Sequence, residues 1–253
     1  MTKEKVNKGG EVLMMAKSIE TAPKKSDINE ILAWLKKEKD CNKYGEGFYN
    51  NNDIIIDSFE SGKAITLKYE NENIGLITWS DYDILVNIDI FVIHPNYRRN
   101  GFGEYFYRTV SDYFKAKGFK AIKLFCAPKT SENFWKKMGL VKLYNCGYTE
   151  HELTYYDVLV EVASTTDISK SDKIELWNVE PYEATEKPPQ WTWFIDICED
   201  KLKLPIIQPC NCNWNLSWSR NGVVIKEEKV KYFTEKDYEL FRSNFLYIEE
   251  LKN

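Results

Sequence analysis

The chain has 253 residues, of which 43% are hydrophobic and 15% aromatic, a composition typical of a globular protein with a substantial core. No apolar run approaches the ~18 residues that a membrane span needs, and residues 12–16 are too few for the apolar core of a signal peptide. We therefore expect a soluble, cytoplasmic protein with no membrane partner. A net charge of −4 and a pI near 5.5 argue against nucleic acid as a partner.

Charge is unevenly distributed along the chain. Residues 1–150 carry a net charge of +3 and residues 151–253 a net charge of −7. The cationic part suits a cofactor with several phosphates, whereas the acidic part either attracts cationic amines or is an ordinary solvated surface.

The six cysteines are scattered, at positions 41, 126, 146, 198, 210 and 212. Cys210 and Cys212 are either a metal or redox pair or structural thiols. Because no second pair follows at zinc-like spacing, we predict structural thiols and no metal.

The N-terminal part of the chain is predicted to hold a leader, a helix and a short strand. Residues 1–26 read as a flexible leader. Asp27 and Glu30 have the spacing of a capping box ahead of apolar residues at helical spacing, which predicts a short amphipathic helix. Residues 43–52 predict a loop that leads into a short strand at residues 54–56.

A hairpin and a central strand follow. Residues 64–69 and 74–79 predict an antiparallel hairpin around residues 71–73, and residues 80–83 predict a turn into a strand over residues 84–93. Alternate side chains of a strand point to opposite faces. One face of this strand is apolar, with Val86, Ile88, Ile90 and Val92, and the other carries Asn87, Asp89 and Phe91.

A loop and a helix follow the central strand. Pro95 ends the strand pairing, and apolar residues at positions 102, 105, 106, 110, 113 and 114 recur at helical spacing. The first turn of this helix has free N–H groups at the positive end of its dipole, and Gly101 and Gly103 let a ligand approach the backbone. The sequence therefore predicts an anion site suited to a pyrophosphate.

Two blocks of the sequence resemble the GNAT superfamily of acyl-CoA-dependent N-acyltransferases. The first is Arg98-x-x-Gly101-x-Gly103, with the apolar-x-Pro strand end of the family at residues 93–95. The second is SENFWKKMGL at residues 131–140, which is similar to the next helix of the family and its Phe-Tyr-x-x-x-Gly-Phe ending.

The elements between the two blocks also follow the family's order. A helix, a glycine at position 118 as its C′ residue and a strand over residues 120–126 separate the blocks. The resemblance covers roughly residues 27–160.

The resemblance implies an α/β fold with a mixed sheet and a splayed central strand, in a domain over residues 27–162. It implies acetyl-CoA as cosubstrate, with the pantetheine arm on the backbone of residues 91–93 and the pyrophosphate wrapped by residues 98–104. The implied cofactor-binding residues are Phe91, Val92, Ile93, Arg98, Arg99, Asn100, Gly101, Phe102, Gly103, Glu104, Asn133 and Trp135. A backbone N–H near Val92 or Ile93 would polarise the thioester carbonyl.

The second block departs from the family at the residue that protonates the leaving thiolate. The family often has Tyr there, and this chain has Trp135, whose indole is a poor acid. The usual Asn seven residues earlier is replaced by Pro128, and Asn133 is a substitute for it. Tyr144 and Tyr148 are alternative acids without positional support.

The candidate base is Asp89, which would act through water, with Asn87 as a second catalytic candidate at a position where some relatives carry a catalytic Glu. The alternative is that Asp89 only pairs with a neighbouring strand or lysine. His94 is interpreted as turn surface.

The end of the first domain and the start of the second are also predicted. Residues 140–144 and 153–161 predict two strands that close the first sheet, with a turn at 145–147. Residues 163–171 predict a linker.

Residues 172–253 predict a smaller accessory α+β domain with antiparallel strands. Alternation of Trp214, Leu216 and Trp218 with polar residues, followed by Asn221-Gly222, predicts a hairpin. Its aromatic face is either a sugar- or partner-binding surface or core, and alternation favours core. An earlier strand would hold Trp191, Trp193 and Ile195. A last helix after residue 234 would hold Tyr238, Phe241, Phe245 and Ile248.

These predictions lead to an N-acetyltransferase that moves an acetyl group from acetyl-CoA to a primary amine of a small molecule or peptide. A homodimer is compatible with this prediction. The alternative is a non-catalytic acyl-CoA-binding or regulatory module that acts through its C-terminal domain.

Overall fold

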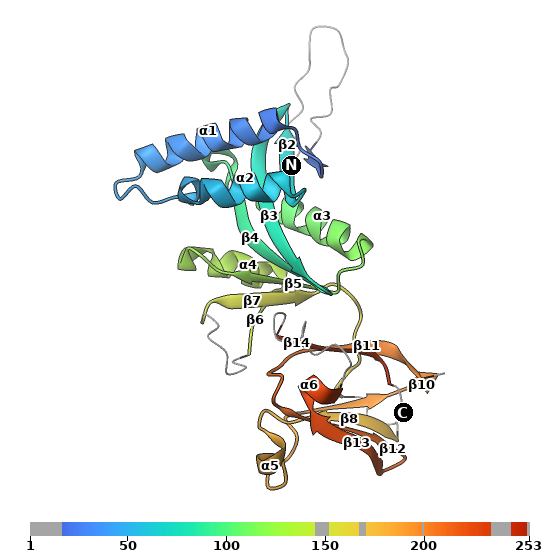
Figure 1. The fold of residues 1–253 in the computed structure, drawn as a ribbon. Helices are drawn as coiled ribbons and strands as arrows, with labels where there is room; N and C mark the ends of the chain where they lie inside the picture. Colours follow the sequence, from blue (N-terminus) through green and yellow to red (C-terminus); the bar gives the residue numbers. More distant parts are fainter. Residues whose placement is uncertain (1–16, 145–151, 167–170, 199, 234–243, 252–253) are drawn as a thin grey trace. The chain divides into compact units, whose positions relative to one another are not determined.

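The computed structural model describes residues 17–144, 152–166, 171–198, 200–233 and 244–251 (Figure 1). The chain divides into two compact units. The first is Met1–Asp81 with Val86–Gly118, and the second is Tyr82–Leu85 with Phe119–Asn253. None of the helices in the described ranges is long and apolar enough to cross a membrane.

The first unit contains a sheet in which neighbouring strands follow chain order. The strands are β1 (Lys17–Glu20), β2 (Ala64–Tyr69), β3 (Glu72–Tyr82) and β4 (Leu85–Ile93). β1 pairs antiparallel with β2, and β2 with β3, which confirms the predicted hairpin. Its turn lies at Glu70 and Asn71, which both have positive φ. Residues 17–20 were predicted as part of a flexible leader, and that prediction is wrong because their backbone pairs with β2.

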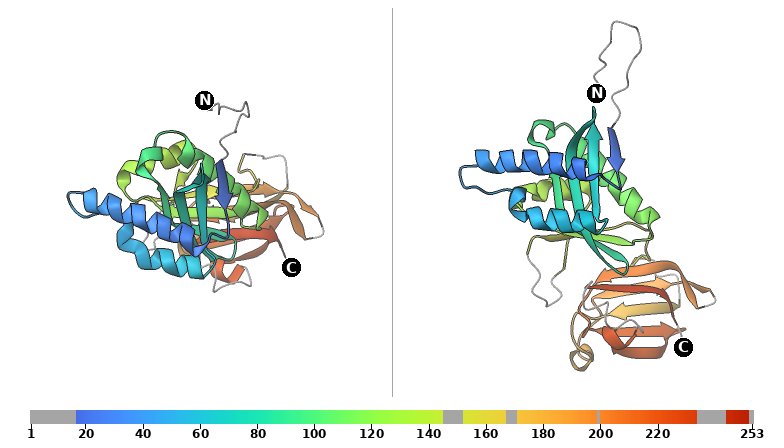
Figure 2. Two further views of the ribbon diagram at one scale, coloured as in Figure 1. Left: turned by 90° about the horizontal axis from the view of Figure 1, so that it is seen from above. Right: turned by 45° about the horizontal axis from the view of Figure 1, so that its top comes forward.

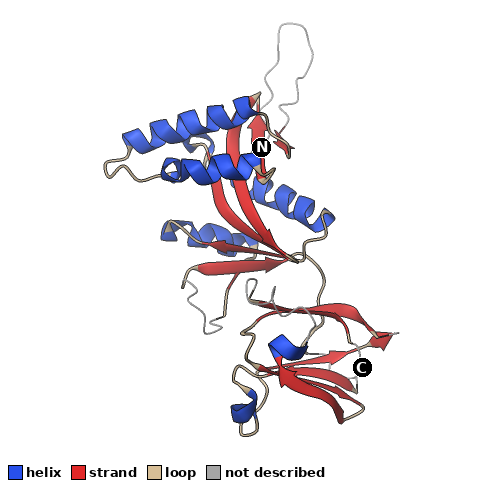
Figure 3. Ribbon diagram, viewed as in Figure 1, coloured by secondary structure: helices blue, strands red, loops and turns tan. Residues whose placement is uncertain are grey.

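Helices cover both faces of this sheet. α1 (Lys25–Cys41) and α2 (Asn52–Glu60) lie on one face (Figure 3), and α3 (Phe102–Ala116) lies on the other. Short 3₁₀ turns η1 (Phe48–Asn51) and η2 (Pro95–Tyr97) complete the unit. Ile31, Ile55 and Ile90 meet in the core under α1 and α2. On the α3 side, the ring of Phe91 lies 5.7 Å from that of Phe106, centroid to centroid.

Two local predictions in this unit are wrong. Residues 54–56 form part of α2 instead of a strand: Ile55 is fully buried under the sheet, whereas Ile54 and Ile56 are exposed. A helix can bury one of three consecutive residues, so the apolar run did not fix a strand. The turn predicted at residues 80–83 comes later, because β3 continues through Tyr82.

A polar network joins α1 to the β2–β3 hairpin. Asp27 accepts hydrogen bonds from the backbone N–H of Lys24 at 2.8 Å and from the Asn73 side chain at 3.2 Å, and it pairs with the Lys68 ammonium at 3.1 Å. Glu30 accepts from the backbone N–H of Asn73 at 3.0 Å. The predicted capping box, with Asp27 ahead of the helix and Glu30 three residues later, is therefore wrong by one turn. α1 begins at Lys25, its N-cap is Lys24, and Asp27 caps the helix from its third position. Asp27 also ties this helix to the sheet.

The second unit begins with the remaining elements of the first predicted domain. These are β5 (Ala121–Phe125), η3 (Lys129–Ser131), α4 (Glu132–Met138), β6 (Val141–Lys142) and β7 (Thr154–Val158). β7 pairs antiparallel with both β5 and β6. The predicted strands are confirmed, although β6 and β7 are shorter than expected. The predicted turn at 145–147 and the candidate acid Tyr148 lie outside the described residues.

The rest of the second unit holds two antiparallel sheets (Figure 2). One has the strand order β13-β12-β8-β9 and the other β10-β11-β14. The strands are β8 (Asp172–Leu176), β9 (Trp191–Ile195), β10 (Ile197–Cys198), β11 (Lys201–Pro209), β12 (Asn215–Arg220), β13 (Val223–Lys229) and β14 (Phe245–Glu250), with one-turn helices α5 (Pro181–Ala184) and α6 (Val230–Phe233). The predicted mixed α/β class with additional antiparallel strands is therefore confirmed.

The two sheets share a core that contains the predicted aromatic face. Trp193, Leu216 and Trp218 are buried in one cluster with Ile206 and Leu246 of the three-stranded sheet. This confirms the hairpin at Asn221-Gly222 and the core interpretation of its alternating Trp residues. Cys210 and Cys212 are also buried.

The predicted last helix is wrong for the part that the structure describes. Residues 245–250 form β14, whose Leu246 and Ile248 belong to the core between the sheets. Phe245 points to the other face, where it clusters with Leu85, Ala121 and Ile207. The three-stranded sheet is thus apolar on both faces. Residues 234–243, which hold Tyr238 and Phe241, lie outside the described residues.

Candidate functional site

The backbone groups of β4 alternate in direction, and this decides which edge of the strand each of them faces. The N–H of His94 donates to the carbonyl of Ile74 in β3 at 2.7 Å. Successive residues of a strand present their N–H and C=O to opposite edges. The backbone groups of Val92 therefore face β3, whereas those of Phe91 and Ile93 face the other edge of β4.

The loop after β4 turns tightly into α3. The N–H groups of Tyr97 and Arg98 donate to the carbonyls of His94 and Pro95. Arg99 and Gly101 both have left-handed backbones, with φ of 64° and 79°. A Cβ added at Gly101 would meet no atom within 4 Å, so the space above this residue is open.

The start of α3 has the features of an anion site. Its N-cap is Gly101, which offers no side-chain acceptor to the first-turn amides. The first turn of a helix has N–H groups without intrahelical partners, at the positive end of the dipole. Gly103 and Glu104 are partly buried and Phe102 is buried, whereas Arg99 and Asn100 are exposed. The loop is thus exposed from Arg99 to Gly101, and its role in binding a pyrophosphate stays a prediction.

Aromatic rings pack against each other in and beside this loop. The ring of Tyr97 lies 5.6 Å from that of Phe102 and 5.9 Å from that of Tyr69. The Tyr97 hydroxyl donates to Glu72 at 2.6 Å, and this hydrogen bond, with burial, raises the pKa of Tyr97 to about 12. His94 packs edge-on against Trp34, and burial lowers the pKa of its imidazole. The loop conformation is therefore built into the core of the first unit.

The side chain of Arg98 turns away from the loop that it begins. Its Nε donates to the carbonyl of Ile93 at 2.7 Å, and its terminal NH1 pairs with Glu38 of α1 at 2.7 Å. Sequence reasoning missed Glu38, because nothing in the local pattern links residue 38 to residue 98.

Asp89 lies in a small polar cluster on the α3 face of β4. It accepts hydrogen bonds from the side chains of Asn87 at 2.6 Å and Ser80 at 3.3 Å. Removal of the carboxylate from water raises the pKa of Asp89, and the two hydrogen bonds and the charge of Lys63 offset part of this rise. The structure brings both predicted catalytic residues together, with Ser80 as a third member that the sequence did not single out.

The predicted residues on α4 belong to the second unit. Asn133 is exposed, whereas Trp135 is only 5% exposed and packs against the ring of Phe134 at 4.8 Å. Trp135 is therefore part of the core under α4. The nearby Tyr155 is also buried, and its hydroxyl donates to Glu132. That hydrogen bond, with burial, raises the pKa of Tyr155.

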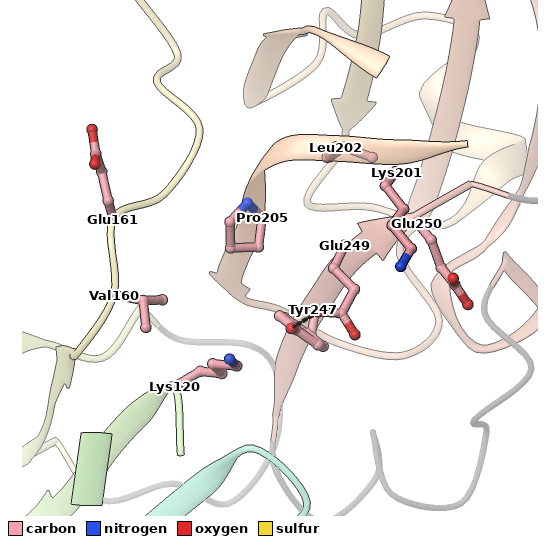
Figure 4. Close-up of a pocket in the computed structure, with 9 residues that line it drawn as sticks. All are labelled: Lys120, Val160, Glu161, Lys201, Leu202, Pro205, Tyr247, Glu249 and Glu250. Atoms are coloured by element: carbon pink, nitrogen blue, oxygen red, sulfur yellow. Dashed lines mark hydrogen bonds between the residues drawn. The ribbon is translucent and has the colours of Figure 1, made fainter. Parts of the chain in front are cut away.

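A cavity of about 350 Å³ in the second unit contains none of the predicted site residues. Figure 4 shows Lys201 beside Glu250 on neighbouring strands, with Lys120 reaching in from the start of β5. The Tyr247 hydroxyl donates to Glu249 at 2.5 Å, and burial above all raises the pKa of Tyr247. Because both lysines and glutamates line this cavity, its lining selects no single ligand chemistry.

Comparisons with known proteins agree with the two sequence blocks. Residues 28–140 match the model of the acetyltransferase (GNAT) family. None of the curated proteins matches the chain.

Three solved structures are similar to part of this chain. Ard1 from Thermoplasma volcanium is 17% identical, with a TM-score of 0.45 over 58% of this chain and 99% of that chain. The GNAT family N-acetyltransferase YhbS from Escherichia coli, in complex with CoA, is 15% identical, with a TM-score of 0.45 over 58% of this chain and 83% of that chain. The PaiA N-acetyltransferase from Thermoplasma acidophilum, in complex with coenzyme A, is 14% identical, with a TM-score of 0.44 over 57% and 99%.

The family match begins in α1 and ends directly after α4, so it spans the loop, the helix start and both sequence blocks that carried the resemblance. Residues 28–140 of this chain are therefore a domain of the acetyltransferase (GNAT) family.

Proposed function

We propose that the chain is a cytoplasmic N-acetyltransferase that moves an acetyl group from acetyl-CoA to a primary amine of a small molecule or peptide. The observation that carries the proposal is the open start of α3 directly after β4. There, glycine at the N-cap leaves the first amides of the helix without a side-chain acceptor and leaves space above them. The family match over residues 28–140 supports this assignment.

The residues of the loop would hold the cosubstrate in two ways. Backbone N–H groups of residues 102–104 would donate to the pyrophosphate, and the exposed Arg99 would add a charge-assisted contact. The Phe91 backbone and the Ile93 N–H, which face away from β3, would pair with the pantetheine arm. Acetyl-CoA would supply the activated acetyl thioester, and the Ile93 N–H would donate to the carbonyl oxygen as negative charge builds on it.

Asp89 would accept the proton that the amine must lose before it attacks. At pH 7, deprotonation of an alkyl amine of pKa ~10.4 costs roughly 4.6 kcal/mol, whereas a thiol of pKa ~8.5 leaves as thiolate at much smaller cost. The base therefore matters more than the acid. Asp89 lies on the α3 face of β4, opposite the face that α1 and α2 cover. We propose that the proton passes from the amine to Asp89 through an intervening water.

The test measures thiol release and cofactor binding together. Thiol release from acetyl-CoA is followed over a panel of primary amines, and acetylated products are identified by mass spectrometry. Gly103→Glu places a carboxylate at the start of α3 and is expected to abolish CoA binding with the fold intact. Asp112→Asn, at an exposed position later in α3, is the control. Unchanged CoA affinity in Gly103→Glu would refute the loop assignment.

One observation favours a second candidate function. Trp135 replaces the usual tyrosine acid and is buried, as it would be in an acyl-CoA-binding module that no longer catalyses transfer. Retained CoA binding without thiol release over the whole amine panel would support this module, with the C-terminal sheets as its partner-binding part.

A further inference from the structure

We propose that Arg98, the first residue of the cofactor signature, is a positioning residue that fixes the end of β4 and does not contact the pyrophosphate. For its effect on catalysis, this inference rests on the proposed function. Its structural basis is a set of contacts made entirely within the first unit.

The guanidinium is already engaged by two acceptors from different elements. Its Nε donates to the Ile93 carbonyl at 2.7 Å, and its NH1 donates to Glu38 at 2.7 Å. Both are charge-assisted contacts, which are stronger than neutral hydrogen bonds. A phosphate would have to compete with the Glu38 carboxylate for this guanidinium.

The contact with Ile93 engages the peptide group between Ile93 and His94, at the end of β4. This peptide donates through the His94 N–H to Ile74 at 2.7 Å and accepts from Arg98 at its oxygen. Both of its polar atoms are therefore held, one on each edge of β4. The guanidinium supplies the donor to this carbonyl at the edge that faces away from β3.

The consequence is a fixed direction for the N–H of Ile93. This N–H and the Ile93 carbonyl lie on the same edge of β4, because both belong to one residue. Arg98 thus engages the carbonyl, and the N–H of the same residue is the group proposed to polarise the thioester. Holding the carbonyl limits rotation of this residue and so positions the donor.

Glu38 extends the same restraint to α1. The helix is joined through Glu38 to Arg98 and through Asp27 and Glu30 to the β2–β3 hairpin. The carboxylate also neutralises Arg98, so that the attraction for phosphate comes from the helix start and from Arg99. Arg98 and Arg99 are adjacent, yet the geometry assigns them different tasks.

The experiment compares Arg98→Gln, Arg98→Lys, Glu38→Gln and Arg99→Gln in the full chain. Lysine keeps the charge but has one nitrogen, which cannot span Ile93 and Glu38 as guanidinium does. We expect Arg98→Gln and Arg98→Lys to lower kcat roughly 10- to 100-fold, as expected for a small misplacement at the reacting centre. CoA affinity should change by less than about threefold in both. Glu38→Gln should lower kcat in the same direction, and Arg98→Gln/Glu38→Gln should be non-additive. Arg99→Gln should weaken CoA binding, which Arg98→Gln and Arg98→Lys should not do.

A second readout does not depend on turnover. Hydrogen exchange of the His94 amide should be faster in Arg98→Gln and Arg98→Lys than in the wild type, and unchanged in Arg99→Gln. If the wild type released no thiol with any amine, the proposed function would fail, while exchange and CoA affinity would still test Arg98. The inference is overturned if Arg98→Lys restores full activity, if Arg98→Gln weakens CoA binding tenfold or more, or if His94 exchange is unaffected.

Discussion

At the scale of single residues, Asp89 is held in a state that costs stability. Its pKa is raised, chiefly by partial burial of the carboxylate, although the residue as a whole is exposed to solvent. The folded chain therefore binds more protons than the unfolded chain between the ordinary pKa and the raised one, and the free energy of unfolding falls as pH rises through this range. A group whose ionised form is disfavoured in this way is better suited to accept a proton than an ordinary surface carboxylate.

Asp89→Asn should therefore lower activity while it raises stability. The rate of acetyl transfer is expected to fall most near neutral pH, where the amine still carries its proton, and least at high pH, where the amine is already neutral. The melting temperature at pH 7 should be equal to or above that of the wild type. Activity over a pH series and thermal unfolding measure the two effects, with Asn87→Ala as the neighbouring control. A pH-independent effect, or none, would remove Asp89 from the role of base.

The pKa of Asp27 is shifted in the opposite direction from that of Asp89. Burial alone would raise its pKa, but the hydrogen bonds from Lys24, Lys68 and Asn73 and the charge of Lys68 outweigh burial and lower the pKa below the ordinary value. A carboxylate with a lowered folded pKa contributes stability above the unfolded pKa, and this contribution is lost as pH falls through the folded pKa.

Asp27→Asn should therefore destabilise the protein at pH 7 and matter less in acid. The substitution removes the ion pair with Lys68 and leaves buried donors poorly matched, at a cost of about 1–3 kcal/mol. Urea unfolding at pH 7 and at pH 3 should show the difference from the wild type shrinking at the lower pH. Asp57→Asn, on the exposed side of α2, should show little difference at either pH. An equal loss at both pH values would mean that the charge of Asp27 is not what stabilises α1.

The sequence predicted the positions of single residues well where these depend on near neighbours. Gly101 lies at the start of α3 and Asp89 on β4, as expected, because a glycine at a helix start and a carboxylate on a strand are visible in the local pattern. Their roles in the site stay predictions. Arg98 was assigned to the pyrophosphate, and its contact with Glu38 comes from a helix 60 positions earlier. Trp135 was recognised as a departure from the family, but only the packed structure shows it buried. Roles that depend on distant partners could not be predicted from one sequence.

At the scale of elements, the right predictions rest on local sequence signals and the wrong ones do not. The Asn221-Gly222 hairpin and the helix after Gly101 carry turn and cap signals of their own. Ile54-Ile55-Ile56 has no such signal, and Phe245 and Ile248 match helical spacing by chance. In β14, Leu246 between them is buried on the opposite face from Phe245. In a sheet that is apolar on both faces, a strand lacks the alternation of apolar and polar residues by which it is recognised in the sequence.

Gly75 in β3 sets how closely α3 approaches the sheet. A Cβ at this position would lie 2.9 Å from Ile93 Cδ1, 3.1 Å from Leu67 Cβ and 3.2 Å from Phe106 Cε1. Gly75→Ala should therefore push α3 away and destabilise the fold by about 1–3 kcal/mol. Because Ile93 is one of the three neighbours, CoA affinity should fall as well. Denaturant unfolding and CoA titration measure these effects.

The pair of Gly75→Ala with Phe106→Leu provides the control for this prediction. The smaller side chain makes room for the new methyl, so the double variant should be more stable than the sum of the two single losses implies. Strict additivity would show that the close contact with Phe106 does not limit the position of α3.

At the scale of the whole molecule, the predicted linker at residues 163–171 remains a prediction, and the packing on either side of it is informative. Ala163 donates its N–H to the Pro205 carbonyl at 2.9 Å. The Tyr156 ring lies 5.4 Å from that of Phe245, and Tyr144 packs edge-on against Trp191 at 5.4 Å. Within the second unit, segments before and after the linker therefore share apolar contacts.

Limited proteolysis tests how strong these contacts are. Cleavage within residues 163–171 should leave two fragments that elute together on size exclusion and separate in denaturant, because Phe245 and Ile207 bury their side chains against Leu85 and Ala121. Phe245→Ala removes the largest of these side chains, at a cost of about 3–5 kcal/mol, and should let the nicked fragments separate. Val224→Ala, on an exposed edge strand, should not. Fragments of the wild type that separate under native conditions would show two independent domains, in which case the C-terminal sheets contribute nothing to the rigidity of the acetyltransferase part.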